Sequence, residues 1–323
     1  MNTYFLFVIL GFFIVLVIYL TIDPNIEKFG VEYSVSYPDI EEIKNKITSH
    51  KNSYFSYFKL LDAQARNINL SFKDFQEKYN SSFLDIDQKE KDNFDLFYND
   101  IVNMIPLKKR HQLLMPHIKI AKFSGIENEY PHTHSNIIFF NKSVFENDLA
   151  NYQSLEINKN KKLLSLAKTL IHEIVHIKQR ENPGIYDLLF NKWGFNSVSP
   201  QYLNQKLSNN IVSRIRINPD ELPDYRFWVW KNKILPLAIY SSTDITSISD
   251  TIIISVDWNN HRNYTYLDDD NEFMDYFQIH INHYHPNEIL AEYYSIYFME
   301  LTKQLNDTNI TKSEGYKIFK KTF

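Results

Sequence analysis

Cysteine is missing from this 323-residue sequence. Its absence excludes disulfide bonds, thiol nucleophiles and thiolate metal sites, so any bound metal must be held by histidine and carboxylate side chains. Neither sign of charge predominates: the net charge of −4 gives no general reason to expect nucleic-acid binding. We therefore expect the short basic run Lys108–Arg110 to be a solvated surface turn. A hydrophobic content of 44%, with 15% aromatic residues, is ample for a sizeable core and argues against disorder over most of the chain.

An uninterrupted apolar run of 17 residues, Tyr4–Leu20, stands near the start of the sequence. Its length is at the short end of the range for a membrane-spanning helix. A cleaved signal peptide is the alternative, but Met1–Thr3 carries no basic side chain and Thr21–Pro24 offers no small-x-small cleavage pattern. We expect residues 1–22 to be an uncleaved membrane anchor. Its orientation stays open, because basic residues are scarce on both flanks.

The segment after this run is predicted to be a linker followed by helices. Residues 23–38 are the expected linker. Apolar residues then recur at helical spacing over residues 39–105. Within that region, Asp87 and Glu90 match a capping box at the start of a helix.

The rest of the chain alternates between strand and helix patterns. Leucine and isoleucine residues spaced by three and four positions predict a helix over Lys161–Arg180, and Pro183 and Gly184 end it. Pro286 fits the first turn of another helix that runs to about residue 303. Alternating or β-branched runs predict five strands, at His117–Phe123, Asn136–Phe140, Arg226–Trp230, Ile234–Tyr240 and Thr251–Asp257. This order indicates an α+β fold.

The residues best suited to chemistry form the motif His172-Glu173-Ile174-Val175-His176. On a helix His172 and His176 lie about 40° apart, one turn above the other, so both imidazoles can reach one Zn²⁺ at about 2.0–2.1 Å. Glu173 lies about 60° from His176, where its carboxylate can take a proton from a metal-bound water without becoming a ligand. The alternative is a surface helix with two incidental histidines. The apolar neighbours disfavour it, because a partly buried histidine needs a polar partner.

A catalytic zinc site with two histidines needs a third protein ligand and an open position for water. The best candidate lies in the segment Asn287–Glu292, where Glu288 and Glu292 share one helical face. Glu288 would bind the metal, and Glu292 would accept a hydrogen bond from a ligand imidazole and fix its tautomer. Three alternatives stay open: Glu292 as the ligand, a histidine just upstream, and a pair of solvent-facing carboxylates.

Together the two motifs resemble the zincin superfamily of metallopeptidases, and within it the gluzincins of the thermolysin type. The resemblance covers only these two short motifs. It implies a Zn²⁺ cofactor bound by His172, His176 and Glu288, with Glu173 as the catalytic base and Glu292 supporting a ligand.

The resemblance also implies a zincin-like catalytic domain over residues 106–323. The separation between the two motifs is far longer than in the compact gluzincins, so a strand-containing insertion is expected at about residues 195–280. No third histidine follows within Lys178–Pro183, which argues against the metzincin branch. Zincins use a strand at the edge of the sheet to hold an extended substrate. Asn136–Phe140 has the right chain position for that strand, and Pro131–His134 is expected to be a loop or cleft wall rather than a ligand.

Attack on a peptide carbonyl also needs a hydrogen-bond donor for the developing oxyanion. Four suitable side chains crowd just before the second motif: His280, His283, Tyr284 and His285. We take His283 and His285 as the candidate catalytic residues of this group and leave open which of the four is the donor. Aromatic packing against a neighbouring sheet is the alternative. The segment Asn218–Asp220 reads as a turn without an assigned role.

The sequence therefore predicts a single-pass, membrane-anchored zinc metallopeptidase that acts on a peptide or protein and binds no nucleic acid. One alternative is a zinc-stabilised binding or structural membrane protein that cleaves nothing. Another is a membrane-tethered interaction module whose histidines are incidental. The sequence leaves open the substrate, the membrane, the oligomeric state and a regulatory role for residues 39–105.

Overall fold

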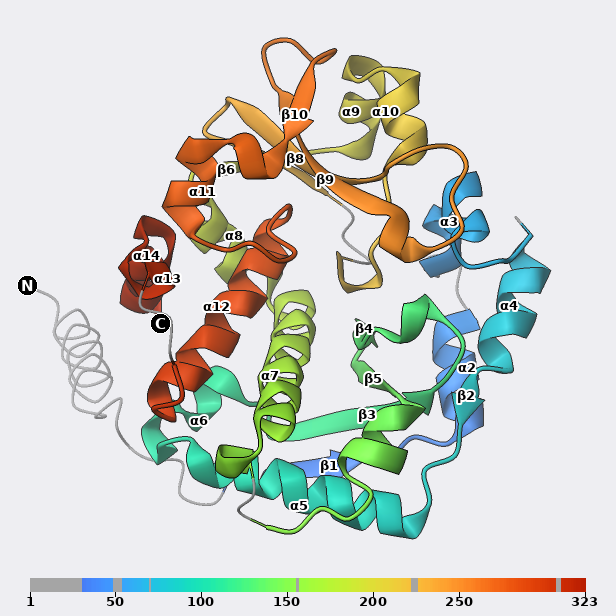
Figure 1. Cartoon of the computed structure of the whole chain (residues 1–323), viewed down its shortest axis with the longest axis vertical. Helices are drawn as coiled ribbons and strands as arrows, with labels where there is room; N and C mark the ends of the chain where they lie inside the picture. Colours follow the sequence, from blue (N-terminus) through green and yellow to red (C-terminus); the bar gives the residue numbers. More distant parts are fainter. Residues whose placement is uncertain (1–30, 49–53, 70, 155–156, 222–225, 306–308) are drawn as a thin grey trace, which may run out of the picture.

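The computed structural model describes residues 31–48, 54–69, 71–154, 157–221, 226–305 and 309–323. Two β-sheets lie on either side of a central pair of long helices, which confirms the predicted α+β class (Figure 1). The expected anchor, residues 1–22, lies outside the described residues. Among the helices within them, none is long and apolar enough to cross a bilayer.

The first sheet has the strand order β1-β3-β5-β4, and β2 pairs with β3 off this path. Strands β1, β3 and β5 are parallel, whereas β4 runs antiparallel to β5 and β2 antiparallel to β3. Strand β1 lies within residues 23–38, the segment expected to be a linker. The bounds are β1 (Ser34–Ser36), β2 (Phe83–Leu84), β3 (His117–Phe123), β4 (His132–His134) and β5 (Ile137–Asn141).

The prediction that Asn136–Phe140 forms the edge strand was wrong, because β5 lies between β3 and β4. After β4 the backbone reverses through Ser135, which adopts a positive φ of 56°. The segment expected to be a loop or cleft wall therefore pairs with β5 and becomes the edge strand itself.

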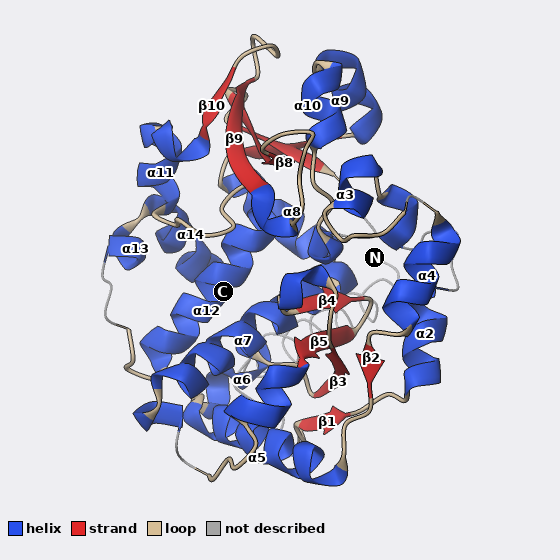
Figure 2. Cartoon of the chain, turned by 45° about the vertical axis from the view of Figure 1, so that its right-hand side comes forward, coloured by secondary structure: helices blue, strands red, loops and turns tan. Residues whose placement is uncertain are grey.

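The second sheet is antiparallel throughout, in the order β10-β9-β8-β7-β6. All of it lies in the sequence between the two long central helices, in line with the strand signals found there. Figure 2 shows the two sheets separated by helices. The bounds are β6 (Phe195–Val198), β7 (Phe227–Trp230), β8 (Ile234–Tyr240), β9 (Thr251–Asp257) and β10 (Tyr264–Tyr266).

Most helices begin where the sequence supplies a capping side chain. The predicted capping box is confirmed: the Asp87 carboxylate accepts from the Glu90 amide at 2.8 Å, and the Glu90 carboxylate accepts from the Asp87 amide at 2.9 Å. The helices are α2 (Ile40–Thr48), α3 (Leu60–Gln64), α4 (Phe72–Asn80), α5 (Gln88–Met104), α6 (Leu107–Leu113), α7 (Lys161–Glu181), α8 (Pro183–Lys192), α9 (Pro200–Lys206), α10 (Asn209–Arg214), α11 (Asn271–Phe277), α12 (Pro286–Leu301), α13 (Asn309–Lys312) and α14 (Glu314–Thr322). A short 3₁₀ turn, η5, spans Pro219–Glu221.

Both faces of the first sheet are covered, which explains the continuous apolar run in β5. Ile138 and Phe140 belong to the main core, together with residues of α5, α7 and α12. Ile137 and Phe139 point to the opposite face and belong to a second core with residues of α2 and α4. The sheet is therefore held by packing on both faces, and α7 packs against one of them.

The C-terminal helix α14 packs closely on α11 and α12 through its glycine, Gly315. A Cβ added at Gly315 would lie 2.6 Å from the Tyr293 hydroxyl oxygen and 2.9 Å from the Phe277 ring. Both rings are fully buried, and the Tyr293 hydroxyl donates to the Phe277 carbonyl oxygen at 2.8 Å. Neither ring can shift without disturbing the core.

We predict that Gly315→Ala lowers the free energy of unfolding by about 1–3 kcal/mol, because the added methyl overpacks a filled interior. The matched control is Gly184→Ala, also at the second position of a helix, where an added Cβ meets no atom within 4 Å. Urea denaturation of the two variants checks this. Equal stability of both variants would contradict the packing described.

Candidate metal centre

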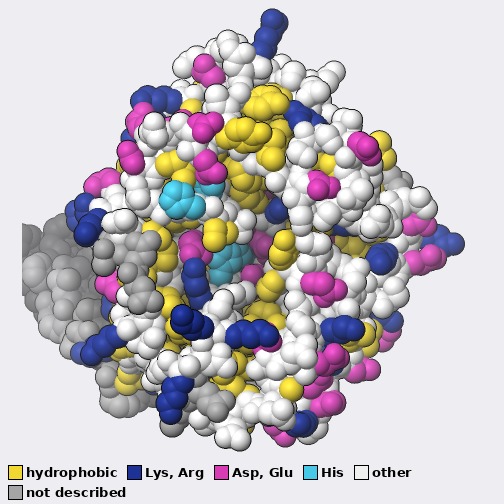
Figure 3. Space-filling model, in the orientation of Figure 1, with side chains coloured by type: hydrophobic (Ala, Val, Ile, Leu, Met, Phe, Trp, Pro, Cys, Tyr) yellow, Lys and Arg dark blue, Asp and Glu magenta, His cyan; other side chains and the backbone are white. Residues whose placement is uncertain are grey.

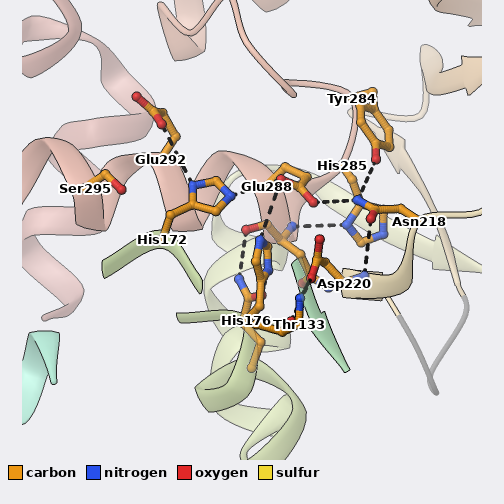
Figure 4. A network of polar contacts seen from close by, with 12 residues as sticks. Thr133, His172, His176, Asn218, Asp220, Tyr284, His285, Glu288, Glu292 and Ser295 are labelled. Atoms are coloured by element: carbon orange, nitrogen blue, oxygen red, sulfur yellow. Dashed lines mark hydrogen bonds and ion pairs between the residues drawn. The ribbon is translucent and has the colours of Figure 1, made fainter. Parts of the chain in front are cut away.

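The pairing of α7 with α12 brings the two sequence motifs together, since these helices pack side by side (Figure 1). His172 and His176 project from one face of α7, and Glu288 from the first turn of α12 (Figure 4). The Glu288 Oε2 atom lies 3.3 Å from His172 Nε2 and 3.7 Å from His176 Nε2. Ligands of a tetrahedral Zn²⁺ at about 2.0–2.1 Å lie roughly 3.3 Å apart. The three side chains could hold one metal ion.

The imidazole of His176 is already oriented for metal binding. Its Nδ1 hydrogen-bonds the Gln179 side-chain oxygen at 2.9 Å, and the Gln179 amide donates to the Asn287 carbonyl oxygen at 2.8 Å. Because Gln179 Oε1 can only accept, the proton of a neutral His176 sits on Nδ1 and the Nε2 lone pair faces Glu288. That Nε2 atom is buried and has no hydrogen-bond partner among the described residues, as expected for an atom that coordinates a metal.

Glu288 is held from the opposite side by an amide. Its Oε1 accepts from Asn218 Nδ2 at 2.8 Å, which leaves Oε2 for the histidines. The same amide nitrogen donates to the Tyr284 hydroxyl at 2.9 Å. These contacts fix the carboxylate before any ion arrives, in the way that supporting hydrogen bonds orient metal ligands elsewhere.

Glu292 lies one turn further along α12, beside the other imidazole. Its Oε2 is 3.9 Å from His172 Nδ1, beyond a direct hydrogen bond. Its other oxygen forms an ion pair with Lys168 of α7. Glu292 thus lies beside His172, as expected, but its closest polar partner is Lys168 and not the imidazole.

The charges around the three residues favour a cation. Burial opposes protonation of His176, but the negative charges of Glu288 and Asp220 outweigh it and raise the pKa of the imidazole to about 10. Burial alone would raise the pKa of Glu288, yet His176 and His172 hold it well below its usual range. A buried cluster with this balance attracts positive charge, which a proton or a metal ion can supply.

Glu173 lies beside the three residues but does not belong to the group that could hold a metal ion. Its side chain is buried and lies against the same cavity as His172 and Glu288. Its Oε2 has no hydrogen-bond partner among the described residues. Burial, reinforced by the negative charge of Asp220, raises the pKa of this carboxyl well above its usual value.

A cavity of about 500 Å³ opens onto these residues. One wall is the segment of residues 216–220, and another is Tyr130–His132, leading into the edge strand β4. Ile253 and Ile281 add apolar surface. Figure 3 shows this face hollowed at its centre, with histidine and acidic side chains visible in the hollow.

The outer edge of β4 is not free. Asp220 Oδ1 accepts from both the Thr133 amide and the Thr133 hydroxyl, each at 2.7 Å. Arg180 of α7 donates to the Ser135 carbonyl oxygen at 3.0 Å and to the Asp220 carbonyl oxygen at 3.1 Å. Asp220 of η5 therefore occupies the Thr133 amide, and Arg180 of α7 the Ser135 carbonyl oxygen, two main-chain groups that an extended peptide could otherwise use.

The candidate oxyanion donors are distributed differently from the expectation. Tyr284 alone of the four lines the cavity. His283 lies 3.0 Å from the Asp268 carboxylate, and His285 caps the first turn of α12 by accepting from the Asn287 amide. His280 is exposed and lies outside the cavity.

The sequence did not predict a role in the site for three residues: Gln179, Asn218 and Asp220. Gln179 stands three positions after His176, on the same helical face, and this spacing was a usable signal. Asn218 and Asp220 lie about seventy residues before Glu288 in a segment that reads as an ordinary turn. No local pattern relates that turn to either motif.

Comparison of the chain with protein-family models, curated proteins and solved structures gave no match. The similarity to zincins therefore rests on the two motifs and on the His172, His176 and Glu288 geometry.

We predict that Asn218→Ala weakens zinc binding by about 10–100-fold, because Glu288 loses the hydrogen bond that orients it. Competition with a chromogenic chelator measures the change. Asn196→Ala, an exposed asparagine on β6, is the control and should bind zinc as tightly as the wild type. Unchanged affinity in Asn218→Ala would mean that the amide does not support a ligand.

Proposed function

We propose that this protein is a zinc-dependent peptidase whose metal is held by His172, His176 and Glu288. One observation carries the proposal: the buried Glu173 Oε2 atom, which has no hydrogen-bond partner among the described residues, lines the same cavity as His172 and Glu288 of the group that could hold a metal ion. Unsatisfied buried polar groups cost about 1–3 kcal/mol each, so they persist where a ligand or a reaction uses them.

The chain's own groups suit hydrolysis of a peptide bond. A bound zinc ion supplies a Lewis acid that polarises the scissile carbonyl and acidifies a water. Glu173 takes the proton from the attacking water and then delivers it to the leaving nitrogen. Its raised pKa favours the first transfer, because it makes the carboxylate a stronger base toward the water's proton. Asn218 and Gln179 hold Glu288 and His176 still during these steps.

The cavity fits a short peptide. Its volume of about 500 Å³ falls within the range of small-ligand sites, and its isoleucines offer apolar contacts for side chains. Pairing of an extended chain with β4 is limited, because Asp220 occupies the Thr133 amide. Substrate is therefore held mainly by side-chain contacts within the cavity.

We also propose that residues 4–20 anchor the protein in a membrane as a single helix. The support is the sequence alone: 17 consecutive apolar residues, without the basic start or cleavage pattern of a signal peptide.

We predict that Glu173→Gln keeps one zinc ion per chain but lowers peptide hydrolysis by about 100-fold or more, because an amide cannot accept the water's proton. Cleavage of a peptide mixture, followed by mass spectrometry, measures the rate, and metal analysis checks the zinc. Glu181→Gln, an exposed position at the end of the same helix, is the control and should hydrolyse normally. A Glu173→Gln variant as active as the wild type would refute the catalytic role.

A further inference from the structure

The cavity wall formed by residues 216–220 contains an arginine, Arg216, in addition to Asn218, which donates to Glu288. Its start is extended: the Arg216 amide donates to the Ala238 carbonyl oxygen at 3.0 Å, and Ile215 forms a bridge with Ile239 of β8. Arg216, Ile217 and Asn218 follow one another along this wall, and all three line the cavity.

Arg216 is the cavity cation that lacks a partner within the described part of the chain. Its Nε atom is buried and has no hydrogen-bond partner there. Tyr284, Tyr240 and Glu221 act on it electrostatically. A guanidinium offers five donors in a planar fork, and a buried donor without an acceptor, as Nε is here, is costly.

The second arginine of the cavity behaves differently. Arg66 forms a two-pronged ion pair with Glu127, with nitrogen–oxygen distances of 3.0 and 2.8 Å. It also donates to the Asp62 carbonyl oxygen at 3.0 Å. Its charge and its donors are therefore satisfied by the protein, whereas the Nε atom of Arg216 has no acceptor among the described residues.

We propose that Arg216 recognises a carboxylate of the peptide substrate, close to the bond that is cleaved. This inference rests on the proposed peptidase function and names the substrate class: peptides with an acidic group near the scissile bond. The position of Arg216 places that group, because it stands two residues, or roughly 7 Å of extended chain, from Asn218, which contacts Glu288. The planar fork of arginine matches a carboxylate in two parallel hydrogen bonds.

The carboxylate has two sources in a peptide: its free C-terminus, or an aspartate or glutamate side chain. Closure of the β4 edge by Asp220 limits how far a substrate extends along that strand, and a chain end suits such a cavity. Both sources offer the same chemistry to Arg216, and the experiment separates them.

The test uses zinc-loaded Glu173→Gln protein, which binds without turning substrate over. Randomised N-acetylated tetrapeptides are offered as a free-acid mixture and as a C-amidated mixture, and bound peptides are quantified by mass spectrometry. Recognition of the C-terminus predicts retention of the free acids roughly 10–100-fold above the amides. Recognition of a side chain predicts a similar enrichment of glutamate or aspartate over glutamine or asparagine within the amidated mixture.

Substitution of the arginine must remove this preference. Adding Arg216→Gln should reduce the discrimination to within about twofold, while Arg216→Lys should retain part of it, because a lysine keeps the charge without the fork. Arg262→Gln makes the same charge change at an exposed position outside the cavity and should change nothing. Zinc content, measured in every variant, separates lost recognition from a disturbed site.

The outcomes keep this inference apart from the peptidase proposal. Charge-dependent binding that Arg216→Gln abolishes supports the inference, even if the wild type cleaves no peptide and the peptidase proposal fails. Cleavage by the wild type without any preference for a carboxylate overturns the inference alone. A preference that survives in Arg216→Gln overturns it as well.

Discussion

The packing of α7 against α12 is the interaction on which the candidate site depends. The hydrophobic stripe of α7, with Leu170, Ile174 and Ile177, lies in one core with Ile289 and Leu290 of α12. Helix α12 is apolar nearly all round, as a helix buried between other elements must be. Since the ligands sit on the same two helices as these core residues, the metal site inherits the rigidity of the core.

Several polar side chains are buried beside that core, at the candidate metal site. Glu173, His176 and Glu288 are all nearly inaccessible to solvent, and two of them keep an atom without a hydrogen-bond partner in the described structure. Such an arrangement weakens a fold unless something binds there. A divalent cation would satisfy both imidazoles and the Glu288 carboxylate at once, and binding free energy of this kind adds to the free energy of unfolding. The same ion would also give Glu173 a water to act on.

Local sequence patterns revealed the parts of this protein whose structure is decided locally. The long helix α7 followed from its three- and four-residue spacing, and the start of α12 from Pro286. The pairing of His172 with His176 in a candidate metal site followed because a helix fixes their relative positions. Patterns of this kind needed no knowledge of the rest of the fold.

The remainder depends on contacts between distant segments, which a single sequence does not reveal. The edge strand was misplaced because three residues, His132–His134, are too few for a periodic signal. Asn218 and Asp220 act through loops that tertiary packing brings to Glu288 and Thr133. The four candidate donors before α12 look equivalent in sequence, and only the fold separates the helix cap His285 from Tyr284 at the cavity.

Zinc K-edge X-ray absorption on the purified, zinc-loaded protein tests the central claim most directly. The account predicts four nitrogen or oxygen neighbours at about 2.0–2.1 Å, with the scattering signature of two imidazoles. One imidazole should disappear from the spectrum of His176→Ala, and none from that of His117→Ala, an exposed histidine on β3. A protein that binds no zinc, or a zinc environment without imidazole, would contradict the convergence of α7 and α12 on a metal ion.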